Sequence, residues 1–135
     1  MALQLSTAVR NAQANAIEAT IGTSAILKIR SGAAPADCAT ADSGTVLATL
    51  ALPSDWMAAA SGGAVAKSGT WQDSSADASG TAGHFRLYAS DGTTCHAQGS
   101  ITATSGGGDM EVQNTNFAAG QSFSITSFTI TMGNA

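Results

Sequence analysis

The side chains with the most reactive chemistry gather in one stretch, AGHFRLYASDGTTCHAQGSI, which runs from Ala82 to Ile101. It contains both histidines of the chain, His84 and His96, and one of the two cysteines, Cys95. Imidazole and thiolate groups are zinc ligands, and a thiol beside a base is a nucleophile. Whether these three side chains form a site depends on how the stretch folds.

The Asp91-Gly92 pair at the centre of the stretch is a strong signal for a β-hairpin, and two pairing registers compete. A two-residue turn pairs Tyr88 with Cys95 and points His96 inward. A three-residue loop, with its glycine in the left-handed conformation, pairs Leu87 with Cys95 and points His96 outward. Because burying a polar side chain without a partner is costly, we expect the three-residue loop.

In the expected register Cys95 faces the core, whereas His84, Arg86 and His96 share the solvent face of the hairpin. Two histidines do not complete a zinc site, which needs three or four ligands, and the guanidinium of Arg86 repels a metal ion. Cys95 also lacks the adjacent base and the electropositive surroundings of a cysteine nucleophile. We therefore expect no catalytic residue, no metal ion, no cofactor and no enzymatic activity.

The second cysteine, Cys38, lies in a long loop, SGAAPADCATADSG, that is long enough to reach Cys95. Two states of this pair stay open, namely separate thiols and a disulfide formed after release from the cell. Asp37 and Asp42 in the same loop could ligate calcium together, but the remaining spacing of an EF-hand is absent. Elsewhere in the chain, Asp is expected in its ordinary role as a turn residue.

A helix is expected from Ser6, a favourable N-cap residue, to Ile21, with Gly22 as its C′ residue. The apolar side of this helix is built of small residues. Such a side covers the edge of a sheet in its own domain or contacts another subunit. The residues on it are Val9, Ala12, Ala16, Ile17 and Thr20.

Beyond Gly22 the apolar residues alternate with a period of two, which is typical of strands. The predicted strands are AILKIR (25–30), TVLATLAL (45–52), AVAKSGTW (64–71) and QSFSITSFTITM (121–132), together with the hairpin. In the last of these, the apolar residues change parity near Ser127. That strand therefore contains a bulge or switches between sheets at this point.

Short strands separated by Gly- and Ser-rich turns predict a mainly β fold, a β-sandwich or jelly-roll-like fold with one N-terminal α-helix. We expect a single domain, 1–135, made of a helical N-terminal segment, 1–22, and a β-sandwich, 23–135. Trp56 and Trp71 are expected to anchor its core.

The composition argues against several classes of partner. Charged residues make up only 10% of the chain, the formal net charge is −4, and the five Lys and Arg residues are scattered, so we expect no nucleic-acid partner. The N-terminal sequence MALQLSTAVRNAQ lacks the pattern of a signal peptide, and no apolar run is long enough to cross a bilayer. We therefore expect synthesis in the cytoplasm and no membrane partner.

Five segments of the chain occur together in a familiar order: LSTAVRNA, ILKIRSGAAPADC, LALPSDWMAAASGG, the hairpin stretch and SFSITSFTITMGNA. This arrangement resembles a widespread group of small virion structural proteins of tailed bacteriophages and prophages. Within the group, the chain looks most like the capsid cement or decoration proteins. The resemblance implies a small β-sandwich or jelly-roll subunit that forms dimers or trimers over the joints between major capsid subunits.

On this hypothesis the protein is made in the host cytoplasm and lies on the exterior of the virion capsid. Its partners are the major capsid protein and further copies of itself. We expect the subunit contacts to come from the N-terminal helix, with Arg10 and Glu18, and from the terminal strand, with Phe128 and Ile130.

An alternative function is that of a tail, baseplate or head-fibre module that binds a glycan on the host surface. Aromatic rings that stack on a sugar would carry this function. The candidate rings are Trp56, Trp71 and Tyr88.

Overall fold

The computed structural model describes residues 3–133, which form one helix and ten strands. These elements are α1 (Thr7–Ile21), β1 (Ile26–Ser31), β2 (Val46–Ala51), β3 (Ala64–Ala66), β4 (Trp71–Asp73), β5 (Gly80–Tyr88), β6 (Cys95–Ala103), β7 (Met110–Val112), β8 (Asn116–Phe117), β9 (Phe123–Ile125) and β10 (Thr129–Thr131). The described chain is mainly β with its helix at the N-terminus, and its sheets do not close into a barrel. The predicted fold class is thus confirmed, and the arrangement is consistent with a β-sandwich.

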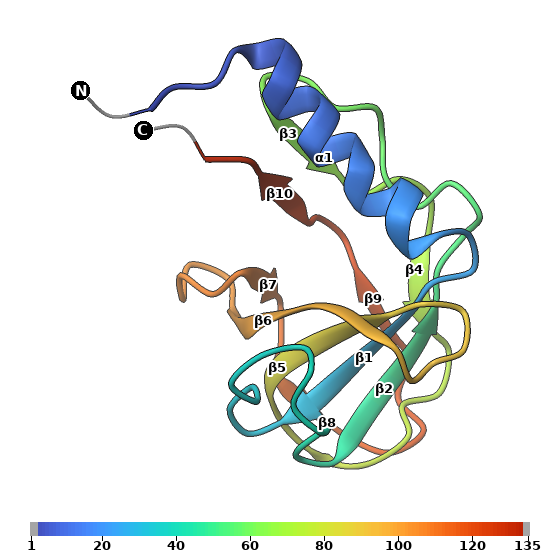
Figure 1. Ribbon diagram of the computed structural model, residues 1–135. Coiled ribbons are helices and arrows are strands. Elements are labelled where there is room, and N and C mark those ends of the chain that lie inside the picture. The colour runs from blue at the N-terminus through green and yellow to red at the C-terminus, as the bar shows by residue number, and fades with distance from the viewer. Residues whose placement is uncertain (1–2, 134–135) are drawn as a thin grey trace.

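The largest sheet has the strand order β2-β1-β5-β6-β7, and β8 pairs with the first residues of β5. Its pairs are antiparallel except for β6 with β7, which run parallel. Two small ribbons, β3 with β10 and β4 with β9, complete the fold. Figure 1 shows α1, β3 and β10 as an upper layer and the large sheet as a lower layer, with β4 and β9 joining the two.

The alternating pattern of β1 places Leu27 and Ile29 on one face of the large sheet. Leu27 and Ile29 are almost fully buried, and Leu27 lies between Leu50 of β2 and Leu87 of β5. Residues opposite one another on a shared face are the unit of side-chain packing in a sheet. This packing confirms the predicted strands in 25–30 and 45–52.

Two segments predicted as single strands are each interrupted halfway. The segment 64–71 divides into β3 and the start of β4, and the segment 121–132 divides into β9 and β10. The two segments run side by side, so that β3 pairs with β10 and β4 with β9. At the division, Lys67 donates its backbone N–H to the carbonyl of Phe128. The change of parity near Ser127 therefore coincides with a break between β9 and β10, across which the pairing of the two segments shifts by one residue.

Aromatic rings fill the space where the two layers meet. Trp71 lies 6.1 Å from Trp56 and 6.0 Å from Phe128, measured between ring centroids, and Phe85 meets Phe128 edge-on at 5.5 Å. The indole N–H of Trp56 donates to the carbonyl of Gly22 at 3.0 Å, which satisfies its one polar group. Both tryptophans thus anchor the core, as expected.

The helix α1 has the predicted ends. The Ser6 hydroxyl accepts a hydrogen bond from the backbone N–H of Val9 at 3.2 Å, and Gly22 follows the last turn with a φ of 91°. Of the predicted buried side of the helix, Ile17 packs against the core, but the prediction is wrong at Val9. Val9 is 46% exposed, whereas the residues buried by α1 are Ala14 and Ile21.

The side that α1 presents to the domain is largely polar. Three of its side-chain oxygens accept hydrogen bonds from backbone N–H groups of the segment 57–63, which is not part of a continuous strand. The three pairs are Asn11 with Gly63, Asn15 with Ala60, and Glu18 with Met57. The helix therefore docks by supplying acceptors to backbone donors that lack a sheet partner.

The hairpin adopts neither expected register throughout. Near its turn, Tyr88 pairs with Cys95, but a bulge follows, and Leu87 then pairs with Ala97. The expected pairing of Leu87 with Cys95 is therefore wrong. The turn is also longer than expected. Within it, the side chain of Asp91 accepts hydrogen bonds from the backbone N–H groups of Thr93 and Thr94, the two residues before β6.

Candidate functional site

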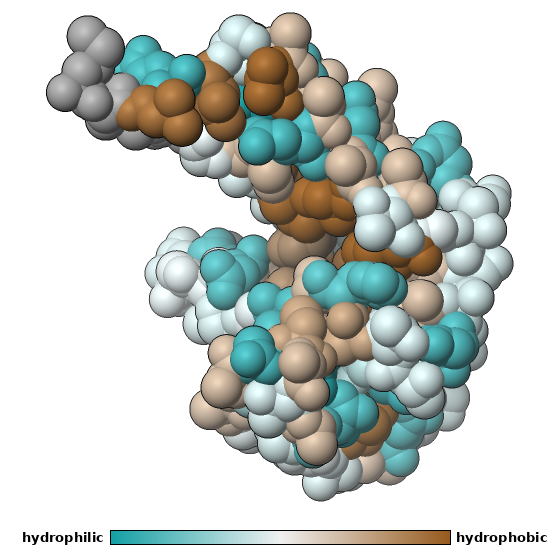
Figure 2. Space-filling model, viewed as in Figure 1, coloured by the Kyte–Doolittle hydropathy of each residue, from teal (hydrophilic) through white to brown (hydrophobic). Residues whose placement is uncertain are grey.

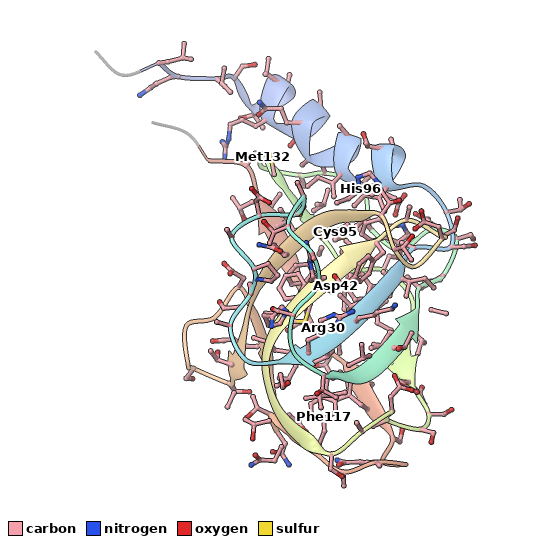
Figure 3. The ribbon with its side chains drawn as sticks, turned by 60° about the horizontal axis from the view of Figure 1, so that its bottom comes forward. Arg30, Asp42, Cys95, His96, Phe117 and Met132 are labelled. Atoms are coloured by element: carbon pink, nitrogen blue, oxygen red, sulfur yellow. The ribbon has the colours of Figure 1, made fainter. Side chains whose placement is uncertain are left out.

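A long loop, residues 32–45, covers the face of the large sheet that we expected to meet solvent (Figure 3). His84 and Arg86 on this face are 0% and 1% exposed, so their expected exposure is wrong. The loop is attached at several points. Nδ1 of His84 lies 2.8 Å from the carbonyl oxygen of Gly32, and the amide of Gln98 donates to the carbonyl of Pro35 at 2.6 Å.

One carboxylate of the loop, that of the partly exposed Asp42, is the centre of a polar cluster with buried side chains of the sheet. Its Oδ1 accepts from the guanidinium of Arg86 at 2.5 Å and from the hydroxyl of Tyr88 at 2.7 Å. Its Oδ2 accepts from Arg30 of β1 at 2.9 Å. The cluster therefore joins the two central strands of the large sheet to the loop that covers them (Figure 3).

The electrostatics of the cluster favour the ionised form of Asp42. Burial by itself raises the pKa of this carboxyl, but hydrogen bonds from Tyr88 and Arg86 and the charges of Arg30 and Arg86 outweigh burial, so its pKa lies below the ordinary value. Burial, followed by the hydrogen bond to Asp42, raises the pKa of Tyr88 to about 12. Two guanidinium groups thus share one carboxylate, which leaves the cluster with an excess of positive charge.

The remaining donors of Arg86 hold the backbone of the loop. Its Nη2 donates to the carbonyl oxygens of Asp37 and Cys38 at 3.2 and 3.0 Å, and its Nη1 donates to that of Thr40 at 3.1 Å. These bonds fix the backbone of the loop over the sheet. The cluster is a structural clamp.

The three side chains that suggested a site in the sequence, His84, Cys95 and His96, do not lie together in the structure. His84 is buried beneath the loop, whereas His96 is exposed beside α1. Cys95 was expected in the core, but the bulge pairs it with Tyr88 and so places it on the face of the sheet that carries Arg86. Within residues 3–133, no group of three or more metal-ligating side chains is close enough to hold an ion.

One hollow in the surface is an apolar groove between the upper layer and β6. One part, of about 300 Å³, is lined by Phe85, Leu87 and Phe128 together with β10 residues and Asp109. The other part, of about 390 Å³, lies between α1 and β6 and includes His96. Ala97 and Ile130 line both parts, so they form one groove. Figure 2 shows this hollow with hydrophobic atoms inside it.

Two strand edges border this groove. Within residues 3–133, β10 pairs with β3 along one edge only, and β6 pairs with β7 only at 101–103. An unpaired strand edge presents backbone donors and acceptors to another chain. The groove therefore combines apolar surface with backbone groups that an extended segment could pair with.

A third cavity, of about 450 Å³, lies on the other side of α1. Glu18, Asp55 and Met57 are among its lining residues. The carboxylate of Glu18 already accepts a hydrogen bond from the backbone N–H of Met57. This cavity therefore lies beside the contact through which α1 docks on the domain.

The residues expected to contact other subunits lie at the groove or at the docked side of α1. Arg10 donates to the carbonyl oxygen of Met132 at 3.1 Å from both Nε and Nη2, and Glu18 accepts from Met57. Phe128 is nearly buried in the aromatic core, and Ile130 is half-buried in the groove. Subunit contacts by these four residues stay a prediction.

Comparison with protein families, with curated proteins and with solved structures gives no match for this chain. Over residues 3–133, no helix is both long enough and apolar enough to cross a bilayer. The function is therefore inferred from the chain's own surfaces.

The rings proposed for sugar stacking are not on the surface. Trp56, Trp71 and Tyr88 are each at most 1% exposed. A sugar would reach them only if the core or the clamp opened, so the glycan-binding alternative loses the residues on which it depended.

Sequence reasoning missed two parts of the site. Asp42 was considered only as a weak calcium ligand, although it organises the clamp. The available signal was the presence of Arg30 and Arg86 on strands whose neighbours are apolar, since a buried arginine needs a carboxylate. Ala97, at the centre of the groove, gave no signal because small residues are common throughout this chain.

Proposed function

We propose that this protein is a capsid cement protein of a tailed bacteriophage. It binds the major capsid protein on the outside of the head and stabilises the shell without catalysing a reaction. The resemblance of the sequence to decoration proteins suggests the partner, and copies of the chain assemble as dimers or trimers.

The observation that carries this proposal is the apolar groove with its two unpaired strand edges. The groove is lined by half-buried Ile130 and Ala97 above a floor of buried aromatic rings. An extended segment of a capsid subunit would bury its side chains there and pair its backbone with β6 or β10. Many equivalent contacts over a shell would turn weak single contacts into firm attachment.

The chemistry of the other residues agrees with a role in binding rather than catalysis. The charged groups under the loop are engaged in the clamp around Asp42, and the histidines lie apart. Short side chains elsewhere lose little conformational entropy when two surfaces meet.

Purified phage heads that lack the protein test the proposal directly. Wild-type protein should bind them saturably, and Ala97→Trp, which fills the groove where its two parts join, should bind at least about tenfold more weakly. The matched control is Ala119→Trp, because Ala119 is exposed in a turn and does not line the groove.

Cryo-EM of intact particles supplies the second measurement. We expect density for hundreds of copies on the head and heads that break more easily when the gene is deleted. Density confined to the tail would refute the cement function, and equal binding of the two tryptophan variants would refute the groove as the contact surface.

A further inference from the structure

The fold brings the two cysteines together although they are far apart in the sequence. Arg86 Nη2 donates to the carbonyl oxygen of Cys38 at 3.0 Å, which holds this part of the loop over the hairpin. Cys95 begins β6 and pairs with Tyr88, two positions along β5 from Arg86. Because Arg86 and Tyr88 have the same parity in β5, Cys95 lies on the same face of the sheet as Arg86, the side chain that binds the backbone of Cys38. The Cys95 thiol interacts electrostatically with the Cys38 thiol and with the Arg86 guanidinium. Both thiols are free and half-exposed.

We propose that Cys38 and Cys95 form a disulfide when the protein leaves the reducing cytoplasm, and that this bond fastens the loop 32–45 to β6. The inference is independent of the proposed function, because it concerns two residues outside the apolar groove. It rests on the placement of Cys95 and Cys38 on either side of Arg86 and on the bonds that hold the loop in place there.

The oxidant that we propose is a small-molecule disulfide such as oxidised glutathione. The Cys38 thiolate attacks one sulfur of this molecule, which forms a mixed disulfide and releases one small thiolate. The Cys95 thiolate then attacks the sulfur of Cys38, forms the intramolecular bond and releases the second small thiolate. In total, the two protein thiols lose two protons and two electrons, and the small disulfide gains them to become two thiols.

The surroundings of Cys95 suit the second step rather than the first. Burial, followed by interaction with Cys38, raises the pKa of Cys95 to about 11, so Cys95 is protonated near neutral pH. Once Cys38 is part of a mixed disulfide, the interaction with the Cys38 thiol that raises the pKa of Cys95 is removed. The guanidinium of Arg86, which lowers this pKa, is then the dominant charge beside the attacking sulfur.

Closing this bond restrains the unfolded chain, because a long stretch of sequence separates the two cysteines. The gain should appear as a rise in the unfolding midpoint of about 5–10 °C. It should also slow exchange of the loop amides with solvent, since the loop could no longer leave the sheet.

The test uses the purified full-length protein incubated with oxidised glutathione. We expect a product that has lost the mass of two hydrogen atoms, a linked peptide pair containing Cys38 and Cys95, and the rise in the unfolding midpoint. Cys95→Ser is the matched control, because it lacks the resolving thiol and should accumulate glutathione on Cys38. Cys38→Ser should react more slowly than Cys95→Ser and gain no stability.

Three results would each overturn the proposal. They are two thiols that stay unmodified, two thiols that each carry glutathione, and a disulfide that joins two molecules. Because no capsid enters this experiment, its failure would leave the proposed function unaffected. Either serine variant could fold poorly, but oxidation of the wild-type chain decides the outcome without them.

Discussion

The hydroxyl of Tyr88 lies 2.7 Å from Oδ1 of Asp42, although the two residues are 46 positions apart in the sequence. The same carboxylate binds Arg86 and Arg30, so one side chain of the loop meets three side chains of the central strands. The loop has no regular secondary structure of its own to hold it there. Its position over the sheet depends on this carboxylate.

Replacing Asp42 with Asn should destabilise the protein. The substitution removes the negative charge shared by Arg30 and Arg86, whose side chains are at most 7% exposed, and leaves them as uncompensated buried cations. Because Asp42 itself is partly exposed, we expect a loss of about 2–3 kcal/mol in the free energy of unfolding, below the value for a fully buried pair. Urea unfolding measures it. Asp55→Asn, at an exposed position, is the control and should change the free energy by less than about 0.5 kcal/mol.

Stability should fall in acid because carboxyl pKa values are depressed in the folded state. Hydrogen bonds from Thr94 and then Thr93 lower the pKa of Asp91 to about 2, and the pKa of Asp42 is lowered despite its burial. Such groups stabilise the fold above the unfolded-state pKa of about 3.9, and this contribution is lost as pH falls through the folded-state pKa.

The free energy of unfolding should therefore decline between about pH 4 and pH 2. Urea unfolding at stepped pH measures the decline, and the Asp42→Asn variant should show a shallower one. An equal decline in the variant and the wild type would show that Asp42 does not contribute to it.

Replacing Asn11 with Ala should loosen the docking of α1. The substitution removes the oxygen that accepts from the N–H of Gly63 at 2.7 Å, and we expect a loss of about 1 kcal/mol. Amide hydrogen exchange should show faster exchange at Gly63. Gln13→Ala, at an exposed position of the same helix that faces the groove, is the control and should leave that exchange rate unchanged. Unchanged exchange in the Asn11 variant would show that packing, not this acceptor, holds the helix.

Local patterns in the sequence predicted the elements well. Ser6 and Gly22 marked the ends of α1, and alternation at Leu27 and Ile29 marked β1. These features depend on residues close together in the chain, so propensity and periodicity are sufficient to find them.

The errors share one physical cause. The predicted register and exposure of the hairpin assume that His84 and Arg86 face solvent. In the structure, their hydrogen-bond partners come from a loop more than 40 positions away. No local pattern reveals such partners. Likewise, the buried side of α1 was sought among apolar residues, whereas Asn11 and Glu18 dock it through hydrogen bonds to backbone.

The polar docking of α1 has a consequence for how this protein opens. Of the helix residues, Ala14 and Ile21 are buried and Ile17 is partly buried, so separation of α1 from the domain would uncover little apolar surface. Water can replace the lost hydrogen-bond partners. Local opening of α1 should therefore depend only weakly on denaturant, while global unfolding, which exposes the aromatic core, depends on it steeply. We therefore expect α1 to open as a separate cooperative unit, with a smaller free energy of opening than the rest of the fold.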